Sequence, residues 1–153
     1  MALRVRGYAS IFGNVDSYGE VVDAGAFSDW LAENPDTSLP LFWEHDHVFA
    51  FENPALPIGK TTMIRQDAKG LYYEAELADT DKAREVAALI EQGAIKNASF
   101  AFSVVDQYQE DEVWHLSALT PKEISPVNWG ANDQAYIEVI PSQETQENGD
   151  EQG

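Results

Sequence analysis

Short segments rich in β-branched and aromatic residues follow one another along this sequence, and only two stretches have the periodicity of an amphipathic helix. Because strands and helices do not alternate regularly, a parallel sheet made of βαβ units is not expected. The pattern predicts an α+β fold that is mainly an antiparallel β-barrel or sandwich with flanking helices. The predicted strands cover residues 3–12, 39–47, 58–66, 71–77, 99–108, 113–119, 123–128 and 135–140.

Two helices are expected between these strands. The clearer one covers Asp81–Gln92, where Thr80 can cap the first turn and Gly93 can end the last. The other is short, near residues 27–33, with Ser28 as its expected cap.

Composition limits both the domain organisation and the chemistry. A chain of 153 residues fits one domain, which we expect over residues 1–141. Residues 142–153 contain acidic but no basic or apolar side chains, so we expect a disordered acidic tail. The absence of cysteine excludes disulfides, thiol catalysis and cysteine metal ligands.

Charge and hydropathy restrict the partners. Nine basic and 27 acidic residues give a formal net charge of −18, which argues against nucleic acid as a partner, because phosphate binding needs clustered Lys and Arg. The sequence has neither the apolar run of a signal peptide nor the length of a membrane span. We therefore expect a soluble protein without a membrane partner.

One predicted strand has two very different faces. Alternation places bulky side chains on one face, expected to be core, and small side chains on the other, where a substrate backbone could approach closely. Serines on such a face are more often simply hydrated, so residue type alone does not identify a nucleophile. The bulky residues are Phe100, Phe102 and Val104, and the small ones are Ser99, Ala101 and Ser103.

Two of the three histidines occur close together, at His45 and His47. A histidine can act as a general base near neutral pH, and a His-x-His pair can also bind a metal ion. Both could equally be half-exposed strand residues. Glu123 lies among apolar and small residues, where a carboxylate could orient an imidazole, although an exposed glutamate is the commoner case.

Four segments in this order resemble the HK97-type phage prohead (capsid maturation) protease family. They are Gly7-Tyr8-Ala9-Ser10-Ile11-Phe12, Leu41-Phe42-Trp43-Glu44-His45-Asp46, Asn97-Ala98-Ser99-Phe100-Ala101-Phe102 and Glu123-Ile124-Ser125-Pro126-Val127.

The resemblance implies Ser99 as nucleophile, His45 as general base and Glu123 as the third catalytic residue, with no cofactor. It also implies the fold of herpesvirus assembly proteases, a Greek-key barrel with flanking helices. We expect oxyanion donors among the backbone N–H groups of residues 130–132, because such donors need a tight turn close to the nucleophile.

The implied function is that of a serine endopeptidase that cleaves the scaffold segment of the major capsid protein inside the procapsid. The same resemblance implies that the enzyme cleaves itself and that it is located within the procapsid, in the bacterial host cytoplasm. Whether the chain forms a homo-oligomer stays open. Two alternatives remain at this point. One is a metal-dependent hydrolase using His45 and His47 with His115 or a carboxylate. The other is a non-enzymatic capsid assembly module whose acidic tail binds basic shell segments.

Overall fold

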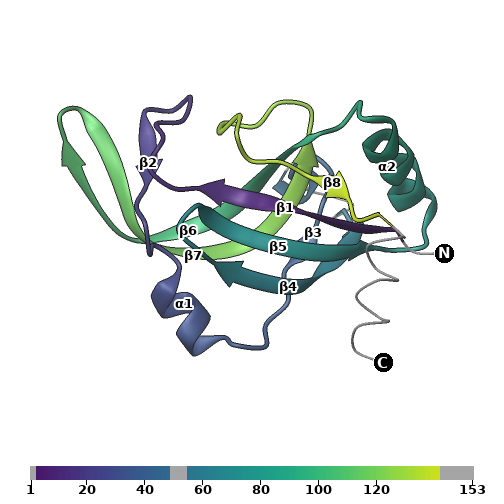
Figure 1. Cartoon of the computed structure of the whole chain (residues 1–153), viewed down its shortest axis with the longest axis horizontal. Helices are drawn as coiled ribbons and strands as arrows, with labels where there is room; N and C mark the ends of the chain where they lie inside the picture. The colour runs from purple at the N-terminus through teal and green to yellow at the C-terminus, as the bar shows by residue number, and fades with distance from the viewer. Residues whose placement is uncertain (1–2, 49–54, 142–153) are drawn as a thin grey trace.

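The computed structural model describes residues 3–48 and 55–141, and its centre is one mixed β-sheet (Figure 1). The expected tail, 142–153, lies outside the described residues. None of the helices in the described ranges is long and apolar enough to cross a membrane. The strands are β1 (Arg4–Ile11), β2 (Glu20–Val22), β3 (Pro40–Leu41), β4 (Gly59–Gln66), β5 (Gly70–Leu77), β6 (Asn97–Glu110), β7 (Val113–Val127) and β8 (Glu138–Val139).

The sheet is not closed into a barrel, which corrects the expected closed architecture. Its strand order is β2-β7-β3-β4-β5-β1-β8, with β6 paired to β7 beside this path. The strands at the two ends, β2 and β8, are only three and two residues long, too short to close a barrel. Most pairings are antiparallel as predicted, but β2 and β3 run parallel to β7.

Strands β6 and β7 are the longest and form a hairpin whose far end projects from the body (Figure 1). The prediction of separate strands at 113–119 and 123–128 was wrong, because β7 is continuous through Pro121. Proline cannot donate to a sheet ladder and is tolerated at irregularities. The β6–β7 register shifts here, between Ala101 and Phe102, and Phe102 is paired with Pro121.

The longer helix, α2 (Asp81–Gln92), begins and ends where the sequence predicts. The Thr80 side chain accepts a hydrogen bond from the Ala83 N–H, and Gly93 adopts the left-handed conformation. The shorter helix, α1 (Ser28–Glu33), is not capped by Ser28. The Ser28 hydroxyl instead accepts a hydrogen bond from Gln66 at the end of β4.

The hydrophobic core lies against the sheet and includes the fully buried Phe27, Leu41, Tyr73 and Ile124. Tyr73 donates its hydroxyl hydrogen to the Tyr136 carbonyl, which ties the core to the segment before β8. That segment was predicted as strand over 135–140, but only Glu138–Val139 pairs as one.

Gly70 allows β5 to approach β1 closely. A Cβ atom at Gly70 would lie 1.9 Å from the Ser10 carbonyl oxygen. At Gly93 no atom lies within 4 Å of the added Cβ, and the backbone has φ +85°.

We therefore expect Gly70→Ala to lower the free energy of unfolding by about 3 kcal/mol or more, because the backbone of β1 at Ser10 must move to make room for the Cβ atom. Gly93→Ala should cost only about 1 kcal/mol, the strain of a left-handed alanine. Urea unfolding of both variants measures the difference. Equal losses would show that close packing of β1 on β5 is not required.

Candidate active site

The register of β6 on β7 brings two predicted site residues to one face of the sheet. Ser99 is opposite Ser125, and Ala101 is opposite Glu123. Directly opposed residues of an antiparallel pair point to the same side, and so do residues two apart on one strand. Ser99 and Glu123 are therefore diagonal neighbours on one face.

His45 is held by a tight turn, which corrects the predicted strand at 39–47. Only β3, Pro40–Leu41, is a strand in this segment, and residues Asp46–Val48 form a short 3₁₀ helix, η1. Glu44 and His45 both have φ near +52°, in the left-handed region that non-glycine residues rarely occupy. The turn directs the imidazole of His45 over the β6–β7 face.

Hydrogen bonds to the end of β7 hold this turn in place. The Glu44 N–H donates to the Pro126 carbonyl at 3.1 Å. The His45 N–H donates to the Ser125 hydroxyl oxygen at 3.1 Å, and the Asn128 N–H donates to the Glu44 carboxylate at 2.6 Å. These contacts offset the conformational strain of the turn.

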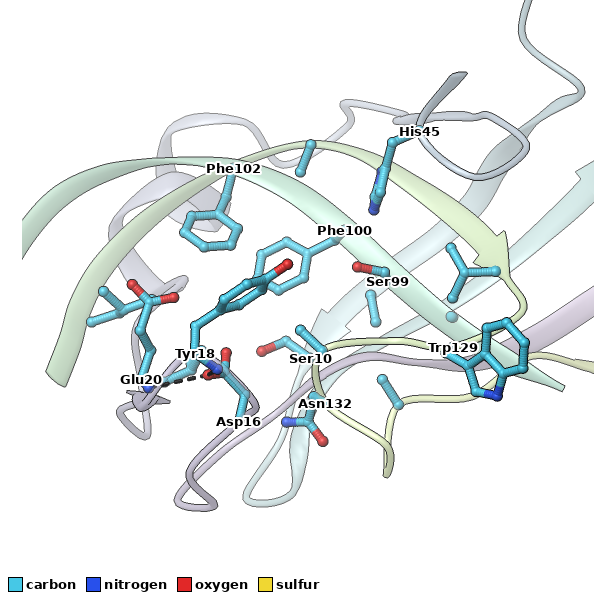
Figure 2. A pocket seen from close by; sticks show the side chains of 18 of the residues that line it. Ser10, Asp16, Tyr18, Glu20, His45, Ser99, Phe100, Phe102, Trp129 and Asn132 are labelled. Carbon is cyan, nitrogen blue, oxygen red and sulfur yellow. Dashed lines mark hydrogen bonds between the residues drawn. The ribbon is translucent and has the colours of Figure 1, made fainter. Parts of the chain in front are cut away.

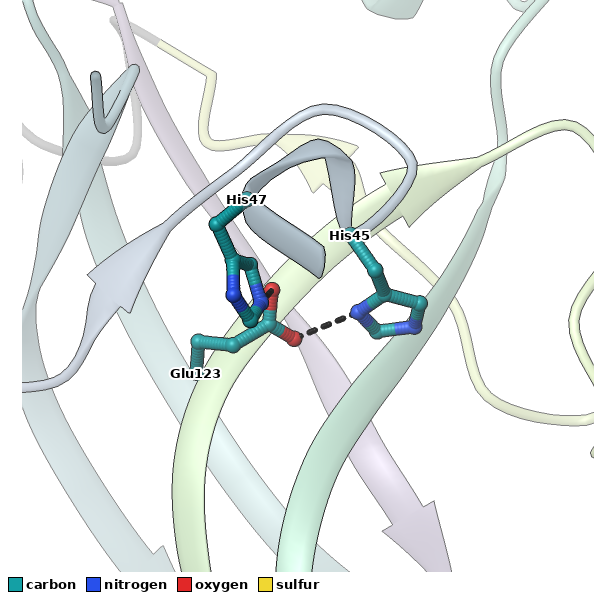
Figure 3. A group of neighbouring side chains, drawn as sticks. All are labelled: His45, His47 and Glu123. Atoms are coloured by element: carbon teal, nitrogen blue, oxygen red, sulfur yellow. Dashed lines mark hydrogen bonds and ion pairs between the residues drawn. The ribbon is translucent and has the colours of Figure 1, made fainter. Parts of the chain in front are cut away.

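The carboxylate of Glu123 lies between His45 and His47 at the centre of the site (Figure 3). Glu123 is only 1% exposed. Its Oε1 lies 2.6 Å from His45 Nδ1 and accepts from the Ala101 N–H at 3.1 Å. Its Oε2 lies 3.1 Å from His47 Nε2 and accepts from the Ser125 hydroxyl at 2.8 Å. Four donors therefore replace the water that an exposed carboxylate would bind.

This arrangement fixes the tautomer of His45. An ionised carboxylate only accepts hydrogen bonds, so the His45 Nδ1 that faces Glu123 must carry a hydrogen. In the neutral ring, Nε2 is then the nitrogen with a free lone pair. Figure 2 shows the His45 ring directed toward Ser99, and both residues line one cavity of about 580 Å³.

The predicted two-faced pattern of β6 is only partly present. Phe100 and Phe102 are half-buried, pack against the core and line the cavity. Val104 was expected in the core, but it is 42% exposed because the hairpin has already left the body at this position. The small residues Ser99 and Ala101 also line the cavity, as a substrate-facing strand requires.

His115, the histidine considered as a further metal ligand, and Asp46, the acid next to His45, are not part of the cluster of His45, His47 and Glu123. Asp46 forms an ion pair with Lys82 of α2, rather than with the imidazole of its neighbour. His115 Nδ1 lies 2.9 Å from an Asp23 oxygen, and its ring stacks on Tyr108.

Sequence reasoning missed two contributors to the site. Ser125 bonds both His45 and Glu123, and the backbone N–H of Ala101 bonds the carboxylate. The small and apolar residues next to Glu123 in the sequence indicate that it is buried. Nothing in the sequence indicates which donors surround its carboxylate.

Comparisons with known proteins show the family to which the chain belongs. A model of the caudovirus prohead serine protease family matches residues 2–151. The chain belongs to this family. It is 32% identical over 140 residues to the prohead protease of Enterobacteria phage HK97. That match covers 89% of this chain but 59% of the HK97 protein, so the chain spans about three-fifths of its relative's length.

Solved structures show the same fold. The protease of Kaposi's sarcoma herpesvirus, in complex with a hexapeptide phosphonate inhibitor, has a TM-score of 0.63 at 12% identity, covering 93% of this chain and 66% of that one. The varicella-zoster virus protease has a TM-score of 0.56 at 11% identity, covering 95% and 67%. The expected similarity to the herpesvirus protease fold is thus confirmed, apart from barrel closure.

The short contact between His45 and Glu123 makes a spectroscopic prediction. In ¹⁵N-histidine NMR above the titration range of the ring, His45 should be protonated at Nδ1 and unprotonated at Nε2, with a strongly downfield Nδ1 proton. Glu123→Gln should move that proton upfield, because a neutral amide is the weaker acceptor. An Nε2–H tautomer in the folded wild type would contradict the geometry.

Proposed function

We propose that this chain is a serine endopeptidase in which Ser99 is the nucleophile, His45 the general base and Glu123 the group that holds the imidazole. The observation that carries the proposal is the alignment of these groups. Glu123 binds Nδ1 of His45, and the remaining ring nitrogen faces the cavity that Ser99 lines.

The chemistry follows from this arrangement. His45 Nε2 takes the Ser99 hydroxyl proton as the oxygen attacks a peptide carbonyl carbon. The imidazolium returns the proton to the leaving amine, and an acyl-enzyme remains. Water, deprotonated by His45, then releases the acyl group and regenerates Ser99. Glu123 stabilises the imidazolium in both steps, since the buried carboxylate is already oriented before the charge forms.

The oxyanion donors are proposed among the backbone N–H groups of residues 130–132. Ala131 and Asn132 line the same cavity as Ser99. Within the described residues, no backbone hydrogen bond uses the N–H of either as a donor. The Asn132 side chain is fixed by a reciprocal pair of hydrogen bonds with Asn14, which makes this loop rigid enough to hold donors in place.

The proposed substrate is the scaffold segment of the major capsid protein, cleaved inside the procapsid within the bacterial host cytoplasm. Family membership supports this choice, together with a 32% identical relative named as a prohead protease. Self-cleavage belongs to the same proposal. A cavity formed by a sheet face suits an extended peptide, because the substrate backbone can lie along the small residues of β6.

The metal-dependent alternative has a real basis in the structure. Donor atoms of His45, His47 and Glu123 all lie within 4.8 Å of one another. Zinc at about 2.0–2.2 Å from each ligand holds tetrahedral ligand atoms about 3.3 Å apart. The 2.6 Å between His45 Nδ1 and Glu123 Oε1 is shorter and fits a direct hydrogen bond. We therefore favour the serine mechanism over metal chemistry.

A fluorophosphonate probe tests the nucleophile without a known substrate. It should label the wild-type chain at one serine, and peptide mapping should place the adduct on Ser99. Ser99→Ala should lose labelling and reduce cleavage of the capsid protein by about 10⁴-fold or more while the melting temperature is kept.

Ser103→Ala is the matched control, because Ser103 lies further along β6, where the strand is exposed. It should retain labelling and cleavage. An adduct on another serine, or equal losses in both variants, would assign the nucleophile elsewhere. Absence of labelling in all variants would favour a non-enzymatic assembly module.

Chelation separates the serine mechanism from the metal hydrolase. Cleavage of the capsid protein should survive EDTA, and elemental analysis of the purified chain should find no stoichiometric zinc. Activity that is lost to EDTA and recovered with zinc would instead place the ion at His45, His47 and Glu123.

A further inference from the structure

The cavity that contains Ser99 continues away from His45 toward a turn between β1 and β2. Asp16, Tyr18 and Glu20 line this part (Figure 2). Including Glu44, three carboxylates line the cavity, and no Lys or Arg does. The cavity wall is therefore strongly negative beside the proposed nucleophile.

The three carboxylates differ in how far their hydrogen bonds are satisfied. Glu44 accepts from the Asn128 N–H, and Asp16 Oδ1 accepts from the N–H groups of Tyr18 and Glu20. The carboxylate of Glu20 has neither a hydrogen bond nor an ion pair with any other residue of the described ranges. Partial burial and, second, the charge of Asp16 raise the pKa of Glu20. A cation between Asp16 and Glu20 would relieve this repulsion.

Ser10 supplies a second, independent observation. It is 2% exposed and lines the same cavity, and its Oγ has no hydrogen-bond partner among the described residues. Figure 2 shows the Ser10 hydroxyl directed into the cavity, on the side of Asp16. Buried hydroxyls are almost always hydrogen-bonded, so an unpartnered one facing a cavity indicates a ligand group that completes it.

We propose that Ser10, Asp16 and Glu20 form a specificity subsite for a lysine or arginine side chain of the substrate, next to the bond that Ser99 cleaves. The inference deepens the proposed endopeptidase function and rests on it. The ammonium or guanidinium group donates hydrogen bonds to the two carboxylates and to the Ser10 oxygen. Tyr18, 77% exposed, offers a ring surface for the alkyl stem.

A calcium ion is the other cation that this turn suggests, because Asn14, Asp16 and Gly19 have the spacing that begins a calcium-binding loop. The Asn14 side chain is already engaged with Asn132 in both directions. Asp16 keeps only one carboxylate oxygen free of the turn. Calcium needs six to eight oxygen ligands. A lysine ammonium, with three N–H donors, or the end of a guanidinium needs fewer acceptors and fits the available oxygens better.

Cleavage of a proteome-derived peptide library, mapped by mass spectrometry, tests this subsite directly. Lysine and arginine should be enriched at one of the two residues that flank the cut bond, and the position shows on which side of the bond the subsite lies. For one cleaved peptide and its norleucine analogue, the wild type should prefer lysine by about 10- to 100-fold in kcat/KM.

Glu20→Gln and Ser10→Ala should each reduce this lysine preference, and Glu20→Lys should reverse it toward acidic residues. Glu110→Gln is the matched control, because it removes one charge from the exposed hairpin and should leave the preference unchanged. Rates of fluorophosphonate labelling at Ser99 should be the same in Glu110→Gln and wild type.

These readouts separate the two levels of the proposal. Normal labelling and cleavage without enrichment of basic residues would overturn the subsite and leave the endopeptidase standing. A lysine preference that Glu20→Gln and Glu110→Gln reduce equally would reflect only the general negative charge, and would also overturn the subsite. Absence of both labelling and cleavage would overturn the endopeptidase function together with its subsite.

Discussion

The buried carboxylate of Glu123 is the interaction on which the site depends. Removing a carboxylate from water costs several kcal/mol unless hydrogen-bond donors replace the solvent. Here the donors come from three segments: Ala101 on β6, Ser125 on β7, and the segment that holds His45 just before η1 and His47 within it. Glu123 can be buried only when these segments meet correctly. The cost of an unsatisfied charge therefore selects the arrangement in which the His45 ring is oriented toward Ser99.

The turn at Glu44 and His45 is the second constraint, and it depends on β7 as well. Two consecutive non-glycine residues in the left-handed region cost about 1–2 kcal/mol each. The Pro126 carbonyl, the Ser125 hydroxyl and the Asn128 N–H bind this turn from the end of β7. The same strand that carries Glu123 thus balances the strain at the proposed base His45, which keeps both residues in one rigid unit.

The sequence predicts elements best where local chemistry is decisive. The β4–β5 hairpin and α2 follow from turn residues and helix caps, which act over a few positions. The strand predicted at 39–47 failed because tertiary hydrogen bonds to β7 hold a turn that no local propensity favours. β2 was not predicted, since its three residues become a strand only by pairing with β7. The open shape of the sheet could not be predicted for the same reason, because β2 and β8 pair with strands that are far away in the sequence.

The residues of the candidate site could be predicted from sequence motifs, but the contacts between them could not. The resemblance to a family nominated Ser99, His45 and Glu123 by motif, and the structure brings Glu123 onto His45 at 2.6 Å. The sequence could not predict how this contact forms. Asp46 follows His45 directly in the sequence, yet it forms an ion pair with Lys82 rather than with the imidazole. The supporting role of Ser125 required knowing its register opposite Ser99.

With a net charge of −18, carboxylates in a cavity could be a consequence of composition alone. Hydrogen-bond satisfaction separates the functional groups from that background. The exposed acids Asp79 and Asp81, for example, are both paired with Arg84. Protein donors satisfy both carboxylate oxygens of Glu123. A carboxylate that holds an imidazole in one orientation needs such fixed hydrogen bonds. The buried Ser10 hydroxyl and the half-buried Glu20 carboxylate have no hydrogen-bond partner among the described residues. Groups that bind a ligand from outside the protein are expected to be unsatisfied in its absence. In the proposed function, the completed polar network at the His45 end of the cavity serves the chemistry, and the incomplete one at Ser10 and Glu20 serves recognition of the substrate.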